Sequence, residues 1–155
     1  MIYAALIVAL VAVDQLVKFL VRANIPEYTS IPFIPHLFEL TFVKNTGAAF
    51  SFLSEHTWLL TIVSAVVAAA LIVALLKKVV THPFGVLSLS VVLAGAVGNL
   101  IDRFFLGYVT DMFQFLPFRF AVFNVADICV VLGGIAFCAY LLFFYEKYEK
   151  KGIQK

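Results

Sequence analysis

Two short polar passages, Tyr108-Val-Thr-Asp111 and Phe123-Asn-Val-Ala-Asp127, precede an apolar run from Ile128 to Phe144. With its flanks, the run is long enough to cross a bilayer as a helix. A carboxylate at the start of a membrane helix is costly, so its presence calls for a reason. The chain between Asp111 and Asp127 can fold back, and two carboxyl groups brought together share a proton. The stretch therefore predicts a membrane helix with an acidic site at its start.

Composition places the whole chain in the membrane. The 155 residues are 64% hydrophobic and only 13% charged, and the mean hydropathy is +1.07. Soluble domains carry about 25% charged residues, so we expect an integral membrane protein. The net charge is only +2, and no basic cluster is interleaved with exposed aromatic residues, which argues against nucleic acid as a partner.

Four apolar segments predict transmembrane helices at about residues 2–22, 57–77, 84–105 and 125–145. A cleavable signal peptide is the alternative for the first segment. However, that segment has no basic start, Asp14 and Lys18 interrupt it, and no A-x-A-like site follows it. We therefore expect a retained helix, extramembrane loops at about 23–56 and 106–124, and a single polytopic membrane domain over 1–155.

The two longer loops carry strand signals. Pro26, Pro32 and Pro35 exclude a long helix from the first loop, and Phe38–Phe42 alternates apolar and polar residues as a strand does. In the second loop, Phe118–Phe123 is short and β-prone, and we expect it to pair with Phe38–Phe42. The predicted fold is an all-α integral membrane protein: four transmembrane helices with a small extracytoplasmic β-sheet built from two loops.

The distribution of lysines predicts the orientation in the membrane. The turn after the second span and the C-terminal tail hold six of the eleven basic residues. These are Lys77, Lys78, Lys147, Lys150, Lys151 and Lys155. The opposite loops hold only Lys44 and Arg119, with Arg22 and Arg103 at helix ends. Because basic residues concentrate on the cytoplasmic side, we expect both termini in the cytoplasm and the polar motifs toward the outer face.

Several polar motifs then fall at the outward ends of the predicted helices. Asp14 and Lys18 are four residues apart, so a helix places them within reach of an ion pair. The pair either lowers the cost of placing its own two charges in the helix, or it holds the residues of a site above it in position. One turn of a helix brings together Asn99, Asp102 and Arg103. They either contribute to a site or form an ordinary capped or ion-paired helix end. The Asn45–Gly47 turn can be an ordinary loop turn, with Asn45 bonding neighbouring backbone.

The reactive groups that such a site offers are carboxylates. The three histidines lie outside the polar cluster, so no serine has a base partner, and no Cys/His grouping has metal-ligand spacing. We therefore expect neither a metal nor another cofactor. Two close aspartates can activate water with the ionised carboxyl and polarise a carbonyl with the protonated one. Asp102, Asp111 and Asp127 all qualify, and a proton or ion pathway in a small carrier fits the same residues.

Five motifs, in order along the chain, resemble those of the bacterial lipoprotein signal peptidases, also called signal peptidase II. They are Asp14-Gln-Leu-Val-Lys18, Asn45-Thr-Gly-Ala-Ala-Phe-Ser51, Gly98-Asn-Leu-Ile-Asp-Arg103, Tyr108-Val-Thr-Asp111 and Phe123-Asn-Val-Ala-Asp127. The resemblance implies an intramembrane aspartic endopeptidase of the bacterial cytoplasmic membrane. It would cleave prolipoproteins just before the cysteine that carries a diacylglyceryl group.

The resemblance also assigns roles to residues. It implies that Asp111 and Asp127 are the catalytic pair, with Asp102 in a supporting role beside Arg103. The other residues that it implies line or brace the site are Asp14, Lys18, Asn45, Gly47, Asn99, Asn124 and Ala126. The partners implied are prolipoprotein substrates and membrane lipids, and we expect a monomer.

Two residues depart from the family pattern. Met112 follows Asp111 where phenylalanine is frequent, and Ile128 follows Asp127 where a small polar residue is common. We expect both departures to affect substrate preference and to leave the reaction unchanged.

Overall fold

A computed structural model describes residues 1–47, 57–118 and 120–148. The described helices are α1 (Ile2–Asn24), α2 (Thr57–Leu76), α3 (Pro83–Leu106), α4 (Val125–Phe143) and the short α5 (Tyr145–Tyr148). The described strands are β1 (Ser30–Ile34), β2 (Phe38–Asn45) and β3 (Val109–Phe115). Five parts of the sequence predictions lie outside the described residues: the stretch 48–51 of the second motif, Arg119, Lys150, Lys151 and Lys155.

Helices α1 to α4 are each long and apolar enough to cross a membrane. They agree with the four predicted spans to within about two residues at each end. The first helix ends at Asn24 because Ile25 is extended (φ −117°, ψ 119°) and stands before Pro26, a position from which proline disfavours helix. The fourth ends at Phe143, slightly earlier than expected, because Phe144 leaves helical geometry (φ −122°, ψ −31°).

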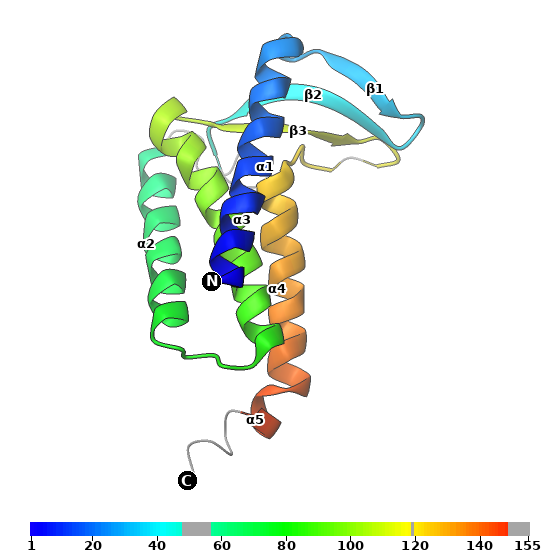
Figure 1. Ribbon diagram of the computed structural model, residues 1–155. Helices are drawn as coiled ribbons and strands as arrows, with labels where there is room; N and C mark the ends of the chain where they lie inside the picture. Colours follow the sequence, from blue (N-terminus) through cyan, green and yellow to red (C-terminus); the bar gives the residue numbers. More distant parts are fainter. Residues whose placement is uncertain (48–56, 119, 149–155) are drawn as a thin grey trace.

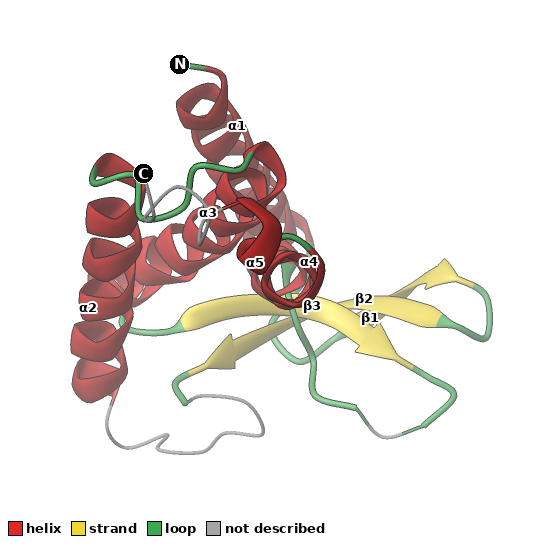
Figure 2. Cartoon of the chain, turned by 90° about the horizontal axis from the view of Figure 1, so that it is seen from below, coloured by secondary structure: helices red, strands yellow, loops and turns green. Residues whose placement is uncertain are grey.

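Helix α3 is central and packs against α1, α2 and α4. Figure 2, which views the bundle from the end opposite the sheet, shows α2 and α4 on different sides of α3. The close packing depends on Gly98, because a Cβ atom there would lie 2.6 Å from Asp14 Oδ2 and 3.2 Å from the Ala126 Cβ. The absence of a side chain at Gly98 therefore lets α1 and α4 approach the same turn of α3.

The strands form an antiparallel sheet in the order β1-β2-β3. The sheet lies across one end of the helices, and the α2–α3 turn and α5 lie at the other end (Figure 1). Val21 of α1 and Ile25 just after it pack against Phe42 of β2 and Met112 of β3 in one buried cluster. This cluster fixes the sheet to the end of α1, next to the start of α4.

One of the two predicted strands is correct and the other is wrong. Phe38–Phe42 lies within β2 as expected, but its partner from the second loop is Val109–Phe115, not Phe118–Phe123. The chain reverses immediately after α3 at Gly107, whose φ of 78° is left-handed, so β3 begins two residues later. Phe123 forms only an isolated bridge with Phe113, because the next residue already caps α4. The sequence also failed to indicate β1, whose Pro32 is tolerated because β1 is an edge strand.

Candidate active site

Helix α4 begins with a reciprocal cap made by two of the predicted site residues. The Asp127 backbone N–H donates to Asn124 Oδ1 at 2.9 Å, and the Asn124 backbone N–H donates to Asp127 Oδ2 at 3.1 Å. This capping box satisfies N–H groups that would otherwise lack partners at the helix start. It also holds the Asp127 carboxylate at the N-terminal end of α4, where the helix dipole favours negative charge.

Asp111 reaches the same place from strand β3. Its Oδ1 accepts from Asn124 Nδ2 at 2.6 Å, and its Oδ2 accepts from Asn45 Nδ2 at 2.8 Å. The carboxyl group is almost fully buried, at 2% exposure. Asn124 therefore contacts both aspartates: its side-chain N–H donates to Asp111, and its side-chain oxygen and backbone N–H bind Asp127.

A second amide, Asn99 of α3, orients Asp127 from the other side. Asn99 Nδ2 donates to Asp127 Oδ1 at 2.7 Å. Its Oδ1 accepts from Lys18 Nζ at 2.9 Å and from Asn124 Nδ2 at 3.1 Å. Because both donors approach the oxygen, the amide can turn only its N–H₂ group toward Asp127. Lys18 thus sets the orientation of Asn99, and Asn99 sets that of Asp127.

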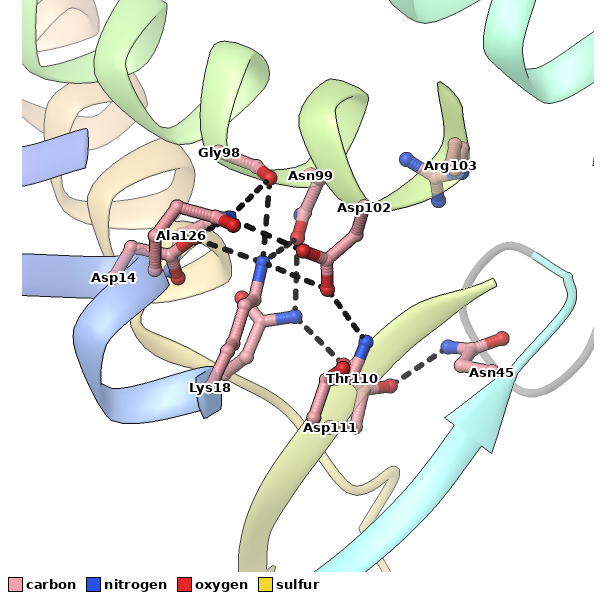
Figure 3. A network of polar contacts seen from close by, with 12 residues as sticks. Asp14, Lys18, Asn45, Gly98, Asn99, Asp102, Arg103, Thr110, Asp111 and Ala126 are labelled. Atoms are coloured by element: carbon pink, nitrogen blue, oxygen red, sulfur yellow. Dashed lines mark hydrogen bonds and ion pairs between the residues drawn. The ribbon is translucent and has the colours of Figure 1, made fainter. Parts of the chain in front are cut away.

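Behind these amides lies a buried ion cluster (Figure 3). Lys18 Nζ is 2.9 Å from Asp14 Oδ2 and 3.6 Å from Asp102 Oδ2, and all three side chains are at most 1% exposed. The predicted Asp14–Lys18 pair is confirmed. Asp14 Oδ1 also accepts from the Ala126 backbone N–H at 2.8 Å, so the cluster ties α1 to the first turn of α4.

Asp102 and Arg103 are adjacent in sequence but point to different places. Asp102 faces Lys18 and accepts from the Thr110 backbone N–H at 2.9 Å. Arg103 faces α2 and the residues after β2, with contacts of 3.4 Å to Ser64 Oγ and to the Gly47 carbonyl oxygen. The two residues therefore lie in different surroundings: Asp102 belongs to the ion cluster, whereas Arg103 lies at the cavity.

A cavity of about 580 Å³ opens in front of the two aspartates. Asp111 and Asp127 line it together with Asn45, Asn99 and Arg103. The remaining wall is apolar and comes from the start of β3, from the segment before α4 and from the first two turns of α4. Its residues are Val109, Phe120, Ala121, Val122, Phe123, Ile128, Val130, Val131 and Leu132. The cavity therefore has a polar end at the carboxyl groups and an apolar side along α4.

The departures from the family pattern differ in their relation to this cavity. Ile128 lines it directly beside Asp127. Met112 is fully buried against Val21, Ile25 and Phe42, because alternate strand residues face opposite sides. Of the two residues, only Ile128 is placed to influence substrate preference.

Burial raises the pKa of Asp111 from 3.8 to about 6, and the nearby Asp127 carboxylate adds to the rise. The hydrogen bonds from Asn45 and Asn124 stabilise the charged form and limit the increase. The ion pairs among the described residues include neither Asp111 nor Asp127. Asp111 therefore keeps its proton to a higher pH than an ordinary aspartate. A carboxyl group that can hold a proton beside an ionised one is suited to acid–base chemistry on water.

The sequence identified the motifs, but it assigned no role to Gln15, Arg22 or Thr110, which contact other polar residues around the site. Gln15 Nε2 contacts Asp14 Oδ2, Asp102 Oδ1 and the Gly98 carbonyl oxygen. Arg22 Nη1 donates to Thr110 Oγ1 at 2.8 Å. Gln15 stands between two predicted residues in the first motif, and that position was the available signal. Arg22 and Thr110 meet only through the fold. The described residues include no group of three or more His, Cys, Asp or Glu side chains placed to bind a metal ion.

Comparison with known proteins identifies the family. A family model described as signal peptidase (SPase) II matches residues 6–143. The chain belongs to the signal peptidase II family. It is 42% identical over 147 residues to the lipoprotein signal peptidase of Clostridioides difficile strain 630, covering 95% of this chain and 99% of that one. The lipoprotein signal peptidase of Clostridium acetobutylicum is 38% identical over 145 residues, covering 91% and 94%.

Solved structures agree with this assignment to signal peptidase II. A bacterial membrane enzyme determined by the in meso method at 2.3 Å resolution superposes with a TM-score of 0.85. It is 29% identical in sequence, and the match covers 95% of this chain and 92% of that chain. The chain is accordingly a multi-span bacterial membrane protein and an aspartic peptidase of the family that processes prolipoproteins.

Proposed function

We propose that this enzyme is an intramembrane aspartic endopeptidase that cleaves prolipoproteins on the N-terminal side of the diacylglyceryl-modified cysteine. Asp111 and Asp127 are the proposed catalytic residues. The observation that carries the proposal is that both carboxyl groups line one cavity and are held there by three asparagines. A carrier would also use buried carboxylates, but the family assignment favours hydrolysis.

In the proposed reaction, a water molecule lies between the two carboxyl groups. The ionised carboxylate takes a proton from this water as its oxygen attacks the scissile carbonyl carbon. The protonated carboxyl group donates a hydrogen bond to the carbonyl oxygen, where negative charge develops. The tetrahedral intermediate then breaks at the C–N bond, and the leaving nitrogen takes a proton from the aspartate pair.

Arg103 is the proposed additional donor to the developing oxyanion. Its guanidinium group lines the cavity, and its contacts to Ser64 Oγ and to the Gly47 carbonyl oxygen are long, at 3.4 Å. Donors on Asn45 and Asn124 already bind Asp111, so these amides hold the carboxyl group in place. Asp14, Lys18, Asn99, Asp102 and Ala126 brace this arrangement from behind, and Gly47 supports Arg103.

The apolar side of the cavity suits a substrate whose lipid chains remain in the bilayer. It runs along α4 through Ile128, Val131 and Leu132, which are 37 to 59% exposed. A lipidated cysteine held by its acyl chains brings its scissile bond to the membrane surface.

In the proposed topology, the site and the sheet lie at the outer face of the cytoplasmic membrane, and both termini lie in the cytoplasm. Membrane lipids surround the four spans, and the active unit is one chain.

The test is cleavage of a diacylglyceryl-modified prolipoprotein peptide by the purified enzyme in detergent, with the cut located by mass spectrometry. We expect the wild type to cut before the lipidated cysteine and Asp111→Asn and Asp127→Asn to lose at least about a thousandfold in turnover. Arg103→Ala should lose about a hundredfold. Full activity in either aspartate variant would mean that the pair is misassigned. A folded wild type that cuts nothing would favour the carrier interpretation.

A further inference from the structure

We infer that Arg22 and Thr110 are positioning residues that hold Asp111 in its catalytic location. The inference rests on the proposed role of Asp111. Neither residue belongs to the catalytic pair, and neither lines the cavity. Their contact joins the end of α1 to the strand residue immediately before Asp111. We call Arg22, Thr110 and Asp102 the β3 clamp.

The clamp acts on a part of β3 that pairs with Val43–Asn45 of β2 but is separated from the rest of the strand by an irregularity in the pairing. Leu40 pairs with Phe113, but Val43 pairs with Asp111, so the register shifts between these positions. Two residues of β2 therefore stand opposite Met112 alone, which is the pattern of a β-bulge. The segment Val109–Asp111 is thus aligned separately from the rest of the strand, and it begins just after the turn at Gly107.

The clamp holds Thr110 through hydrogen bonds to its backbone N–H and to its hydroxyl oxygen. The Thr110 backbone N–H donates to Asp102 Oδ2 at 2.9 Å, as Figure 3 shows. The Thr110 hydroxyl oxygen accepts from Arg22 Nη1 at 2.8 Å. Arg22 also lies 3.9 Å from Asp102 Oδ2, so it supports the carboxylate that holds the backbone. Helices α1 and α3 thereby fix one strand residue at two points.

Burial and charge make this contact strong. Thr110 is 0% exposed and Asp102 is 1% exposed, whereas the Arg22 side chain is 24% exposed. A hydrogen bond from a charged group is roughly twice as strong as one between neutral groups. Removing either partner leaves the other polar group without its bond in a largely buried place, which is costly.

The effect on Asp111 follows from its neighbours. Its carboxyl group accepts from Asn45 of β2 and Asn124 before α4. A small displacement of Thr110 moves Asp111 relative to both amides and relative to Asp127. A misplacement of about 1 Å can lower turnover by about a hundredfold. We expect smaller movements here, with turnover reduced on the order of tenfold.

Three variants test the clamp: Thr110→Val, Arg22→Met and the double variant. Thr110→Val keeps the side-chain shape and removes the hydroxyl, and Arg22→Met keeps an apolar stem and removes the donor. We expect kcat to fall about tenfold in each, with little change in KM, and little further fall in the double variant, because the Arg22–Thr110 hydrogen bond is lost in all three. Thr110→Ser, which retains the hydroxyl, should restore most of the rate.

Thr41→Val is the matched control. It removes another buried threonine hydroxyl in the same sheet, one that donates to the Thr29 carbonyl oxygen at 2.8 Å. We expect it to lower thermal stability while kcat stays within about twofold. Single-variant losses that multiply in the double variant, or no loss of kcat in either, would overturn the clamp.

Hydrogen exchange provides a readout independent of catalysis. Amides in the segment Val109–Asp111 should exchange faster in Thr110→Val and Arg22→Met than in the wild type, and those of α2 should not change. Unchanged exchange at Val109–Asp111 would overturn the clamp even if the enzyme cuts no peptide. Failure of the proposed function is separate: it would appear as an inactive wild type or an active Asp111→Asn variant in the same assay.

Discussion

The protein buries two pairs of aspartates side by side, and their partners differ. Asp14 and Asp102 share Lys18, whose amino nitrogen lies 2.9 and 3.6 Å from their carboxylate oxygens. Asp111 and Asp127 are held by the side-chain amides of Asn45, Asn99 and Asn124, and Asp127 also accepts from the Asn124 backbone N–H. The first pair lies behind the site, whereas the second pair lines the cavity.

This difference separates a structural arrangement from a reactive one. The ammonium group of Lys18 balances the charge of the two carboxylates beside it and fixes their positions, so this pair serves to hold the helices together. Amides hold a carboxyl group in place without supplying a full positive charge, so burial can raise its pKa toward neutrality. The amide-bonded pair is therefore the one suited to exchange protons with water.

The largest effect is expected from breaking the ion cluster. Lys18→Met leaves Asp14 and Asp102 buried without their shared cation, and we expect a loss of about 3–5 kcal/mol in stability. Thermal unfolding in detergent would measure it. Lys44→Met is the matched control, because Lys44 pairs with Glu27 at 2.6 Å with both side chains about one-third exposed, and exposed pairs contribute little to stability. Equal losses in the two variants would contradict the buried role of Lys18.

Removing a charge from the proposed catalytic pair should have the opposite effect and raise the stability of the protein. Raising the pKa of Asp111 from 3.8 to about 6 corresponds to a penalty of at most about 3 kcal/mol at neutral pH. The penalty is absent below pH 3.8, where the carboxyl group is protonated in both folded and unfolded states, and it is complete above about pH 6. Asp111→Asn cannot ionise, so it should be the more stable protein at pH 7 and lose that advantage by pH 4. Its amide meets two donors, which reduces the gain.

Melting temperatures of the wild type and Asp111→Asn from pH 4 to pH 8 would measure this difference. A wild type that is more stable than the variant at pH 7 would show that the Asp111 charge is well compensated, which would remove the contrast between the two pairs.

A smaller effect is expected from Asn45→Ala. This change removes a donor that stabilises the charged form of Asp111, so the pKa of Asp111 should rise further above its value of about 6. The alkaline limb of the kcat/KM profile, where the pair loses its shared proton, should move up by up to about one pH unit. Asn24→Ala serves as the control, because the Asn24 amide donates to the Leu20 carbonyl oxygen at the end of α1 and not to Asp111. A shift toward lower pH in Asn45→Ala would contradict the assignment.

Local patterns predicted the features that depend on neighbouring residues. Hydropathy located the four helices, and the four-residue spacing of Asp14 and Lys18 predicted their ion pair. The strand β3 was missed because its pairing depends on where α3 ends at Gly107. Contacts such as Gln15 with Asp102 and Arg22 with Thr110 join residues 87 and 88 positions apart. No local sequence pattern indicates contacts between residues so far apart, so these contacts are seen only in the folded structure.

The comparison between the two aspartate pairs is tested most directly by one assay on three variants. Asp14→Asn, Asp111→Asn and Asp127→Asn would be measured for lipopeptide cleavage and for the fraction of folded protein under the same conditions. We expect Asp111→Asn and Asp127→Asn to fold well and lose at least about a thousandfold in turnover per folded molecule. We expect Asp14→Asn to be less stable and to keep turnover per folded molecule within about tenfold of the wild type, since Asp14 contacts Ala126 and Lys18 and does not line the cavity. A stable but inactive Asp14→Asn, or an active variant at Asp111 or Asp127, would contradict the division into structural and catalytic pairs.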